Sequence, residues 1–322
     1  MSPISLAHID AAHSLVAPLV YRTPTVDWAG SSLESRLGGT QILCKLELLQ
    51  RTGTFKARGA LMNLLHLEEA ARRRGVTAVS AGNHAVATAF AARELGTSAK
   101  VVMLASANRF RIDRCRAYGA EIVFADDVHS AFDLVEKIRQ EDGRYFVHPF
   151  DGERTILGTA TVGREIILDV PDADAVIVPV GGGGLCAGVA TAVKLTNPSC
   201  EVFGVEPVGA DSMSRSRREG RPVTLERVDT IADSLGAPMS LQYSFDLCNA
   251  HVDEFVTVSD DELVAAMRLI FDDMKMAVEP ACAASTAALL GPLESHLAGK
   301  RVVVIFCGSN IDFDSYARLV AR

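Results

Sequence analysis

Four consecutive glycines at residues 181–184 follow the apolar run 175–180 and precede a helix-like stretch at 185–195. Glycines allow successive backbone N–H groups to converge on one point, and the first turn of the next helix adds its positive dipole end. The pattern predicts an anion-binding loop that could hold a phosphate. A merely flexible turn is the alternative, and it is disfavoured because a glycine run is entropically costly. Neither a P-loop nor a dinucleotide fingerprint matches the spacing.

Lys56 stands in the first turn of a predicted helix, directly after the polar turn at residues 50–54. The positive end of a helix dipole destabilises an ammonium and so favours the neutral amine. A neutral lysine amine is a nucleophile that can condense with an aldehyde, which is how enzymes hold pyridoxal phosphate. A single lysine is more often a solvated surface residue. The predicted phosphate loop favours the chemical role.

Composition narrows the class of protein. The chain has 322 residues, of which 48% are hydrophobic and 22% charged, as expected for an enzyme of two α/β domains. Its net charge of −8 offers no basic surface for nucleic acid or anionic lipid, and neither partner is expected. No apolar run could span a membrane, and residues 1–20 lack a signal-peptide pattern, which predicts a cytoplasmic location. The seven scattered cysteines predict neither a disulfide framework nor a zinc ribbon.

Short β-branched runs alternate with helical patterns along the chain. Candidate strands lie at residues 41–46, 76–79, 100–104, 121–124, 175–180, 201–205 and 301–306, and candidate helices include 55–73, 84–95, 109–118, 131–140 and 260–272. This alternation predicts an α/β fold with parallel sheets and right-handed crossovers. The loops 80–84, 181–184 and 307–310 all follow strands, so we expect them to share one cleft.

With Lys56 and the glycine run together, the sequence resembles the fold-type II family of pyridoxal-phosphate enzymes, in its serine/threonine dehydratase and serine racemase branch. The matching segments are, in chain order, TGTFKARGA at 52–60, SAGNHA at 80–85, HPF at 148–150, GGGGL at 181–185, GVEP at 204–207, TIADSL at 230–235, VEPA at 278–281 and CGSN at 307–310. The resemblance covers nearly the whole chain.

The resemblance implies a tryptophan synthase β-like fold of two domains, each a parallel-rich sheet flanked by helices. Residues 1–74 and 151–322 would form the large cofactor-binding domain, and residues 75–150 a small mobile domain that closes over the substrate. It also implies a homodimer. Because the chain ends shortly after the last matching segment, we expect no effector-binding domain and no feedback inhibition by a branched-chain amino acid.

The resemblance implies that Lys56 forms the Schiff base with pyridoxal 5'-phosphate and, once the substrate has displaced it, removes the α-proton. Phe55 would lie against the cofactor ring, and Asn83 would donate to its phenolic oxygen. The phosphate would be held by backbone amides of Gly181, Gly182, Gly183, Gly184 and Leu185. Cys307 would lie beside the pyridine nitrogen and leave it largely unprotonated. That weaker electron sink suits the loss of a β-leaving group.

The segment at residues 80–84 would bind the substrate. By resemblance, Ser80, Asn83 and His84 present hydrogen-bond donors to its carboxylate from the start of a helix. The family's racemases have a serine at the position of Ala81. Racemisation needs a second acid or base on the face opposite Lys56, and a methyl group can neither give nor accept a proton. The sequence therefore predicts elimination and not racemisation.

Glu206 and Ala210 match two cation ligands of the family, but Ser212 stands at the position of the third, acidic ligand, with Asp211 one residue early. A ligand set short of one carboxylate favours a weakly bound monovalent or divalent cation, or none.

The resemblance thus implies a dehydratase that converts L-threonine or L-serine to a 2-oxo acid and ammonia by α,β-elimination of water. Within the same fold, the alternatives are an amino-acid racemase and a dehydratase of another β-hydroxy amino acid, such as hydroxyaspartate, phenylserine or an ectoine-derived compound. From a different class, the alternative is a non-catalytic amino-acid-binding protein. Glu279, in the VEPA segment, is predicted to lie near the cofactor without a chemical role.

Overall fold

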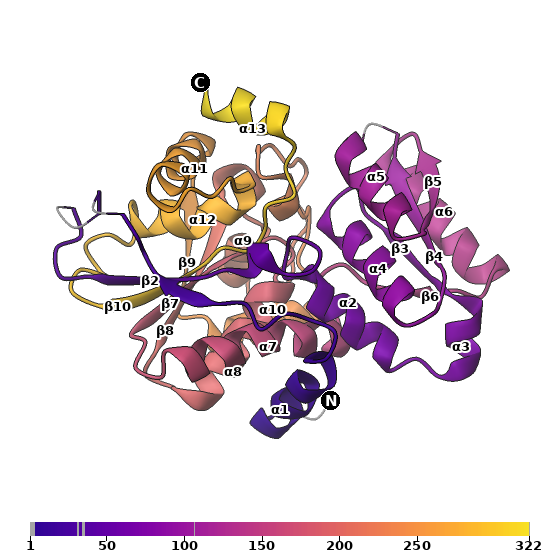
Figure 1. The fold of residues 1–322 in the computed structure, drawn as a ribbon, viewed down its shortest axis with the longest axis horizontal. Helices are drawn as coiled ribbons and strands as arrows, with labels where there is room; N and C mark the ends of the chain where they lie inside the picture. The colour runs from indigo at the N-terminus through magenta and orange to yellow at the C-terminus, as the bar shows by residue number, and fades with distance from the viewer. Residues whose placement is uncertain (1–3, 31, 34–35, 106, 322) are drawn as a thin grey trace.

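The computed structural model describes residues 4–30, 32–33, 36–105 and 107–321. Its strands form two separate sheets, and helices are packed around both (Figure 1). The α/β fold predicted from the alternating pattern is confirmed. No helix within these residues is long and apolar enough to cross a membrane.

The larger sheet has six strands. In spatial order they are β1 (Thr25–Asp27), β2 (Gln41–Lys45), β10 (Arg301–Ile305), β7 (Ala175–Pro179), β8 (Glu201–Pro207) and β9 (Glu254–Val258). β1 is antiparallel to β2, whereas the other neighbours are parallel. All the residues of β7 are buried, as expected for a central parallel strand covered by helices on both faces.

The smaller sheet has four parallel strands. They are β5 (Glu121–Ala125), β4 (Ala99–Leu104), β3 (Val76–Val79) and β6 (Tyr145–Phe146), in that spatial order. With α4 (Asn83–Glu94), α5 (Arg109–Ala117) and α6 (Val128–Glu141) it forms a separate lobe, coloured purple to magenta in Figure 1. These strands fall inside the segment 75–150. The domain boundaries and the mobility of the lobe stay predictions.

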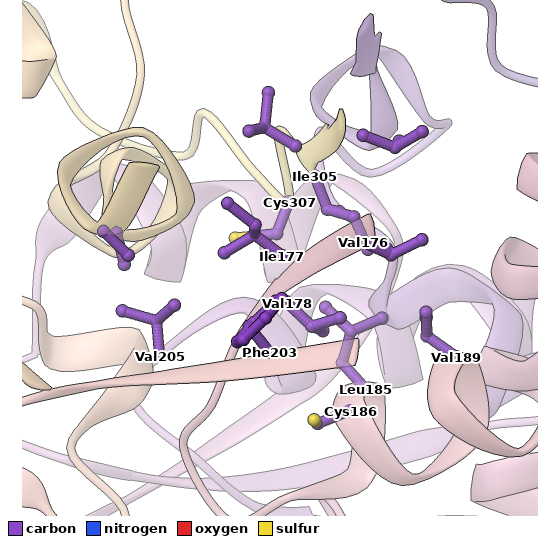
Figure 2. Packing of buried hydrophobic residues seen from close by; sticks show 14 of the residues in the cluster. Val176, Ile177, Val178, Leu185, Cys186, Val189, Phe203, Val205, Ile305 and Cys307 are labelled. Atoms are coloured by element: carbon purple, nitrogen blue, oxygen red, sulfur yellow. The ribbon is translucent and has the colours of Figure 1, made fainter. Parts of the chain in front are cut away.

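The remaining helices are α1 (Leu6–Val16), α2 (Lys56–Leu65), α3 (Glu69–Arg74), α7 (Glu153–Asp169), α8 (Gly184–Thr196), α9 (Ser212–Glu219), α10 (Gln242–His251), α11 (Asp260–Met274), α12 (Pro280–Leu289) and α13 (Phe313–Val320), with short 3-10 turns η1 (Glu47–Leu49), η2 (Val208–Ala210) and η3 (Asp233–Leu235). Of these helices, α2 lies between the lobes, α3 lies beside the smaller lobe, and the others lie on the side of the larger sheet (Figure 1). In the core of the larger lobe, side chains of β7, β8 and β10 pack together with those of α8 (Figure 2).

The structure corrects two details of the predicted elements. The single helix expected at residues 55–73 is two helices, α2 and α3, and the break between them lets Leu67 be buried in the same core as α2. The strands β1, β6 and β9 were not predicted from the sequence. β1 and β6 have only three and two residues, too few to give a hydrophobic period.

A buried cluster of charges holds α2 between the lobes. Arg58 is fully buried and donates to Glu47 at 2.7 and 2.9 Å and to Glu165 at 2.7 and 2.9 Å. Lys45, also fully buried, donates to Glu165 at 2.7 Å. Burial acts to lower the pKa of Arg58, but the two carboxylates outweigh it and raise the pKa. The four side chains link α2 to β2, η1 and α7.

We expect Arg58→Met to lower the free energy of unfolding by about 3–5 kcal/mol, because it leaves two buried carboxylates without their shared partner. Arg73→Met is the matched control, since the ion pair of Arg73 with Glu69 is exposed on α3 and such pairs contribute little. Urea denaturation followed by circular dichroism measures both variants. If Arg58→Met costs no more than Arg73→Met, the cluster does not hold α2 in place.

Candidate active site

Lys56 is the first residue of α2, the helix that lies where the two lobes meet (Figure 1). The backbone N–H of Phe55 donates to the carbonyl of Cys307 at 3.2 Å, so the loop before Lys56 is bonded to the segment after β10. The Lys56 Nζ donates to the carbonyl of Pro149 at 2.7 Å and lies 5.2 Å from the centre of the Phe55 ring. The amine is therefore held by a hydrogen bond to the Pro149 carbonyl, and the backbone before it is held by Cys307.

The environment of Lys56 favours the neutral amine. Burial lowers its pKa to about 8, although the nearby Cys307 and Glu279 act to raise it. From the sequence, we expected the helix dipole to favour the neutral amine. In the structure, the largest cause of the lowered pKa is the removal of water from around the amine. A pKa near 8 leaves a useful fraction of the nucleophilic form at neutral pH.

The glycine run forms a cradle with no space for side chains. An added Cβ at Gly182 would lie 2.3 Å from the ring of Phe150, and one at Gly184 would lie 2.3 Å from the Phe150 carbonyl oxygen. Gly183 has a φ of +92° and is the N-cap of α8, with no side chain capping the helix. The first amides of α8 are thus left for another acceptor. This geometry fits the predicted phosphate-binding loop.

A narrow cavity of about 30 Å³ joins Lys56 to this loop. It is lined by Phe55, Lys56, Asn83, Phe150, Pro179, Gly181, Gly182, Gly183, Gly184, Leu185, Ser234, Leu235, Glu279, Ala281 and Cys307. Every residue predicted to bind the cofactor is in this set, although the sequence separates the first from the last by most of the chain. The residues present fit pyridoxal phosphate, because the lining combines an amine, an uncapped helix start, the aromatic rings of Phe55 and Phe150, and the polar side chain of Asn83. Their individual roles stay predictions.

The narrow cavity adjoins a wider one of about 320 Å³, which Lys56 also lines. Ser80, Ala81, Gly82, Asn83 and His84 lie along it, so the predicted carboxylate-binding segment and the amine face the same space. Gly82 is the N-cap of α4, and no side chain caps that helix either. Its first amides form a second place for an anion.

His84 holds the backbone of a neighbouring segment. Its Nε2 lies 2.8 Å from the carbonyl of Val147, and burial lowers the imidazole pKa to about 3, so the ring is neutral and donates this hydrogen bond. A donor from His84 to the substrate carboxylate would therefore come from its backbone N–H. Ser80 is different, because its hydroxyl oxygen accepts from Gly82 N at 3.1 Å and its own proton can still be donated.

Asn83 is held by residues from distant parts of the chain. Its Nδ2 donates to the Glu279 carboxylate at 2.8 and 3.1 Å and to the Ser234 hydroxyl at 3.1 Å. Its Oδ1 accepts from the Nδ2 of Asn310 at 2.8 Å. These contacts fix which side of the amide donates. Sequence reasoning missed Ser234 and Asn310 and gave Glu279 no role, although all three lie in segments that carry the family resemblance.

Glu279 is a buried carboxyl group at the centre of the site. Burial raises its pKa, while Arg111 and the hydrogen bond from Asn83 act to lower it. Arg111 lies 3.8 Å from Glu279 and is paired with Asp233 of η3, so α5 of the smaller lobe is bonded to the larger lobe at the cavity wall. Glu279 thus positions Asn83 between the lobes.

Cys307 is buried at the end of the narrow cavity. Contact with the Cys282 thiol and burial together raise the pKa of Cys307 well above its usual value. The thiol is therefore neutral, which fits the predicted partner of an unprotonated pyridine nitrogen.

Glu206, near the end of β8, is buried, and its carboxylate contacts the first turn of α9, where the sequence suggested a cation. Its carboxylate accepts from the backbone N–H groups of Met213 and Ser214 at 2.8 Å each, and burial raises its pKa to about 7. Within the described residues, no group of three or more His, Cys, Asp and Glu side chains could hold a metal ion. Ala210 is also buried nearby. The cation stays a prediction, and Glu206 caps α9.

Comparison with known proteins matches residues 16–308 to the family described as "Pyridoxal-phosphate dependent enzyme". Phenylserine dehydratase of Ralstonia pickettii is 59% identical over 280 residues, which cover 87% of this chain and 86% of that protein. L-threonine ammonia-lyase of Thermotoga maritima is 38% identical over 320 residues, covering 99% and 79%. The structure of maize serine racemase superposes with a TM-score of 0.93 at 32% identity, covering 98% and 97%.

We expect Gly183→Asp to weaken binding of pyridoxal 5'-phosphate by about ten-fold or more, because it brings a like charge to the predicted phosphate site. Gly96→Asp is the matched control: Gly96 also has a positive φ, of +65°, but nothing lies within 4 Å of an added Cβ. Titration of the two apoenzymes with the cofactor, followed by absorbance, measures the difference. Equal affinities would show that the phosphate is held elsewhere.

Proposed function

The chain belongs to the family of pyridoxal-phosphate dependent enzymes, and on that basis we propose that it is a dehydratase of β-hydroxy amino acids that prefers an aromatic β-substituent. The substrate class is represented by L-phenylserine, which would be converted to phenylpyruvate and ammonia. The substrate loses a proton from Cα and the hydroxyl group from Cβ, which together make one water. One water is consumed when the resulting imine is hydrolysed to the 2-oxo acid, so the net change is the release of ammonia.

The apolar end of the 320 Å³ cavity is the observation that carries this substrate preference. It consists of the side chains of Val79, Val102 and Leu104, which line the cavity from near the carboxyl ends of β3 and β4. The methyl group of threonine is too small to cover such a wall, whereas a phenyl ring would remove much more apolar surface from water. The 59% identity to a phenylserine dehydratase supports the same preference.

The charges around the cavity disfavour an acidic β-substituent. Among the described residues that line it, the cations are Lys56 and Arg111. Arg111 is already paired with Asp233 and lies near Glu279, so a side-chain carboxylate such as that of hydroxyaspartate would find no free cation. L-Threonine and L-serine, predicted from the sequence, stay candidates, and the 38% identity to a threonine ammonia-lyase supports them.

The side chains of the site would divide the work as follows. The bound cofactor supplies an electron sink for the charge that develops at the substrate Cα. Lys56 would hold the cofactor and then take the proton from Cα, a role supported by its lowered pKa. The uncapped start of α4, with Ser80, would hold the substrate carboxylate. Asn83, oriented by Glu279, would donate to the cofactor ring the Nδ2 proton that bonds to Ser234 in this structure.

The experiment that tests this function is a comparison of kcat/KM for L-phenylserine, L-threonine and L-serine, with release of 2-oxo acid and ammonia as the readout. We expect the highest value for L-phenylserine, because only its side chain fills the apolar end. Lys56→Ala should release no 2-oxo acid from any of them and keep the wild-type circular dichroism. If the wild-type enzyme releases no 2-oxo acid from any of the three substrates, the proposed dehydratase activity is refuted and a binding protein is favoured.

We expect Ala81→Ser to raise the ratio of D-serine to pyruvate formed from L-serine. The wild-type enzyme has a methyl group at the position where a racemase needs an acid or base, so it should form pyruvate with little D-serine. Chiral chromatography of the reaction mixture measures both products. Formation of D-serine by the unmodified enzyme at a rate comparable to that of pyruvate would exclude a dehydratase as the main activity.

A further inference from the structure

Phe132 of α6 lines the 320 Å³ cavity even though 51% of its surface is exposed. A ligand that covered this ring would remove apolar surface from water, which is favourable. Its neighbour Ala131 and Leu104 of β4 line the same cavity. The place of Phe132 beside the substrate space is the first indication of a role in binding.

Packing of the smaller lobe does not account for Phe132. The buried stripe of α6 consists of Ala131, Val135 and Ile138, and it packs against Val102 of β4 and Ala125 of β5. These residues recur at helical spacing, as expected for the face of a helix that covers a sheet. Phe132 is not part of this cluster.

The other exposed aromatic side chains in the described ranges do not line the cavity: they are Tyr21, Phe110, Phe124, Phe271 and Phe313. Phe110 has the guanidinium of Arg114 at 5.7 Å, and Phe271 lies 5.9 Å from the ring of Tyr316. Phe124 of β5, with 46% of its surface exposed, does not line the cavity. Among the large apolar residues exposed in the described ranges, Phe132 is the one that faces the substrate space.

We propose that Phe132 determines specificity by packing its ring against the β-aryl ring of the substrate. Two aromatic rings attract each other in edge-to-face or offset arrangements beyond the effect of buried area alone. The inference rests on the proposed function and names the side chain that recognises its substrate class. An aliphatic β-substituent, as in threonine, would leave the ring of Phe132 uncovered.

Because α6 belongs to the smaller lobe, this contact also ties the lobe to the substrate. Lys56 and the glycine loop hold the reacting end, whereas Phe132 would hold the far end of the side chain. A substrate with an aryl group would thus bridge the lobes, and one without it would not. Specificity would then depend on a residue that has no part in the proton transfers.

The test compares two ligands that lack a β-hydroxyl and cannot lose water: L-phenylalanine and L-2-aminobutyrate. Isothermal titration calorimetry of the cofactor-loaded enzyme gives their affinities for the wild type and for Phe132→Ala, Phe132→Tyr and Phe124→Ala. We expect Phe132→Ala to lower the ratio of the two affinities, phenylalanine over aminobutyrate, by about ten-fold, which corresponds to about 1.4 kcal/mol. Phe132→Tyr keeps the ring and should retain the wild-type ratio within about two-fold. Phe124→Ala should not change it.

Two results would overturn the inference. An unchanged ratio in Phe132→Ala would mean that the ring does not contact the ligand, and equal losses for both ligands would mean that Phe132 only supports the fold. Failure of the proposed function looks different. A wild-type enzyme that binds phenylalanine through Phe132 and yet releases no phenylpyruvate from L-phenylserine would refute the dehydratase and leave the aryl contact standing.

Discussion

The buried pairing of Arg58 with Glu47 and Glu165 is the constraint on which the site depends. Charges removed from water are tolerated only where their partners are in place, so this cluster admits few alternative positions for α2. Arg58 is two residues after Lys56, and the cluster therefore determines where the amine lies. Lys45 balances the charge of the second carboxylate, so the four side chains of the cluster carry no net charge.

Around this fixed amine, two helices point their uncapped N-termini at connected cavities. α8 begins after Gly183 and α4 begins after Gly82, each at the carboxyl end of a parallel strand but in different sheets. A substrate with one carboxylate and a cofactor with one phosphate together present two anions, and each helix start suits one of them. The meeting of two sheets thus explains why the site lies between lobes and not within either.

The sequence predicted the parts of this site that neighbouring residues encode, and not the contacts between distant segments. Sequence reasoning singled out the glycine loop and Lys56 because each is recognised from its immediate neighbours, as are the strands with continuous apolar runs. The bonds from Asn83 to Glu279 and Asn310 were not found, because they join segments about two hundred residues apart. The apolar end of the cavity was missed as well, since Val79 and Leu104 have the same pattern in a sequence as ordinary core residues of a strand.

The division of the site between lobes has a consequence for how its specificity can vary. Lys56, the glycine loop and Cys307 surround the narrow cavity and would carry the chemistry common to the family, while Val79, Leu104 and Phe132 belong to the smaller lobe. A change of residue in the second group alters the shape of the cavity without moving the amine or the uncapped helices. Relatives named for phenylserine and for threonine can therefore share one chemistry, and the residues that separate them are expected on β3, β4 and α6.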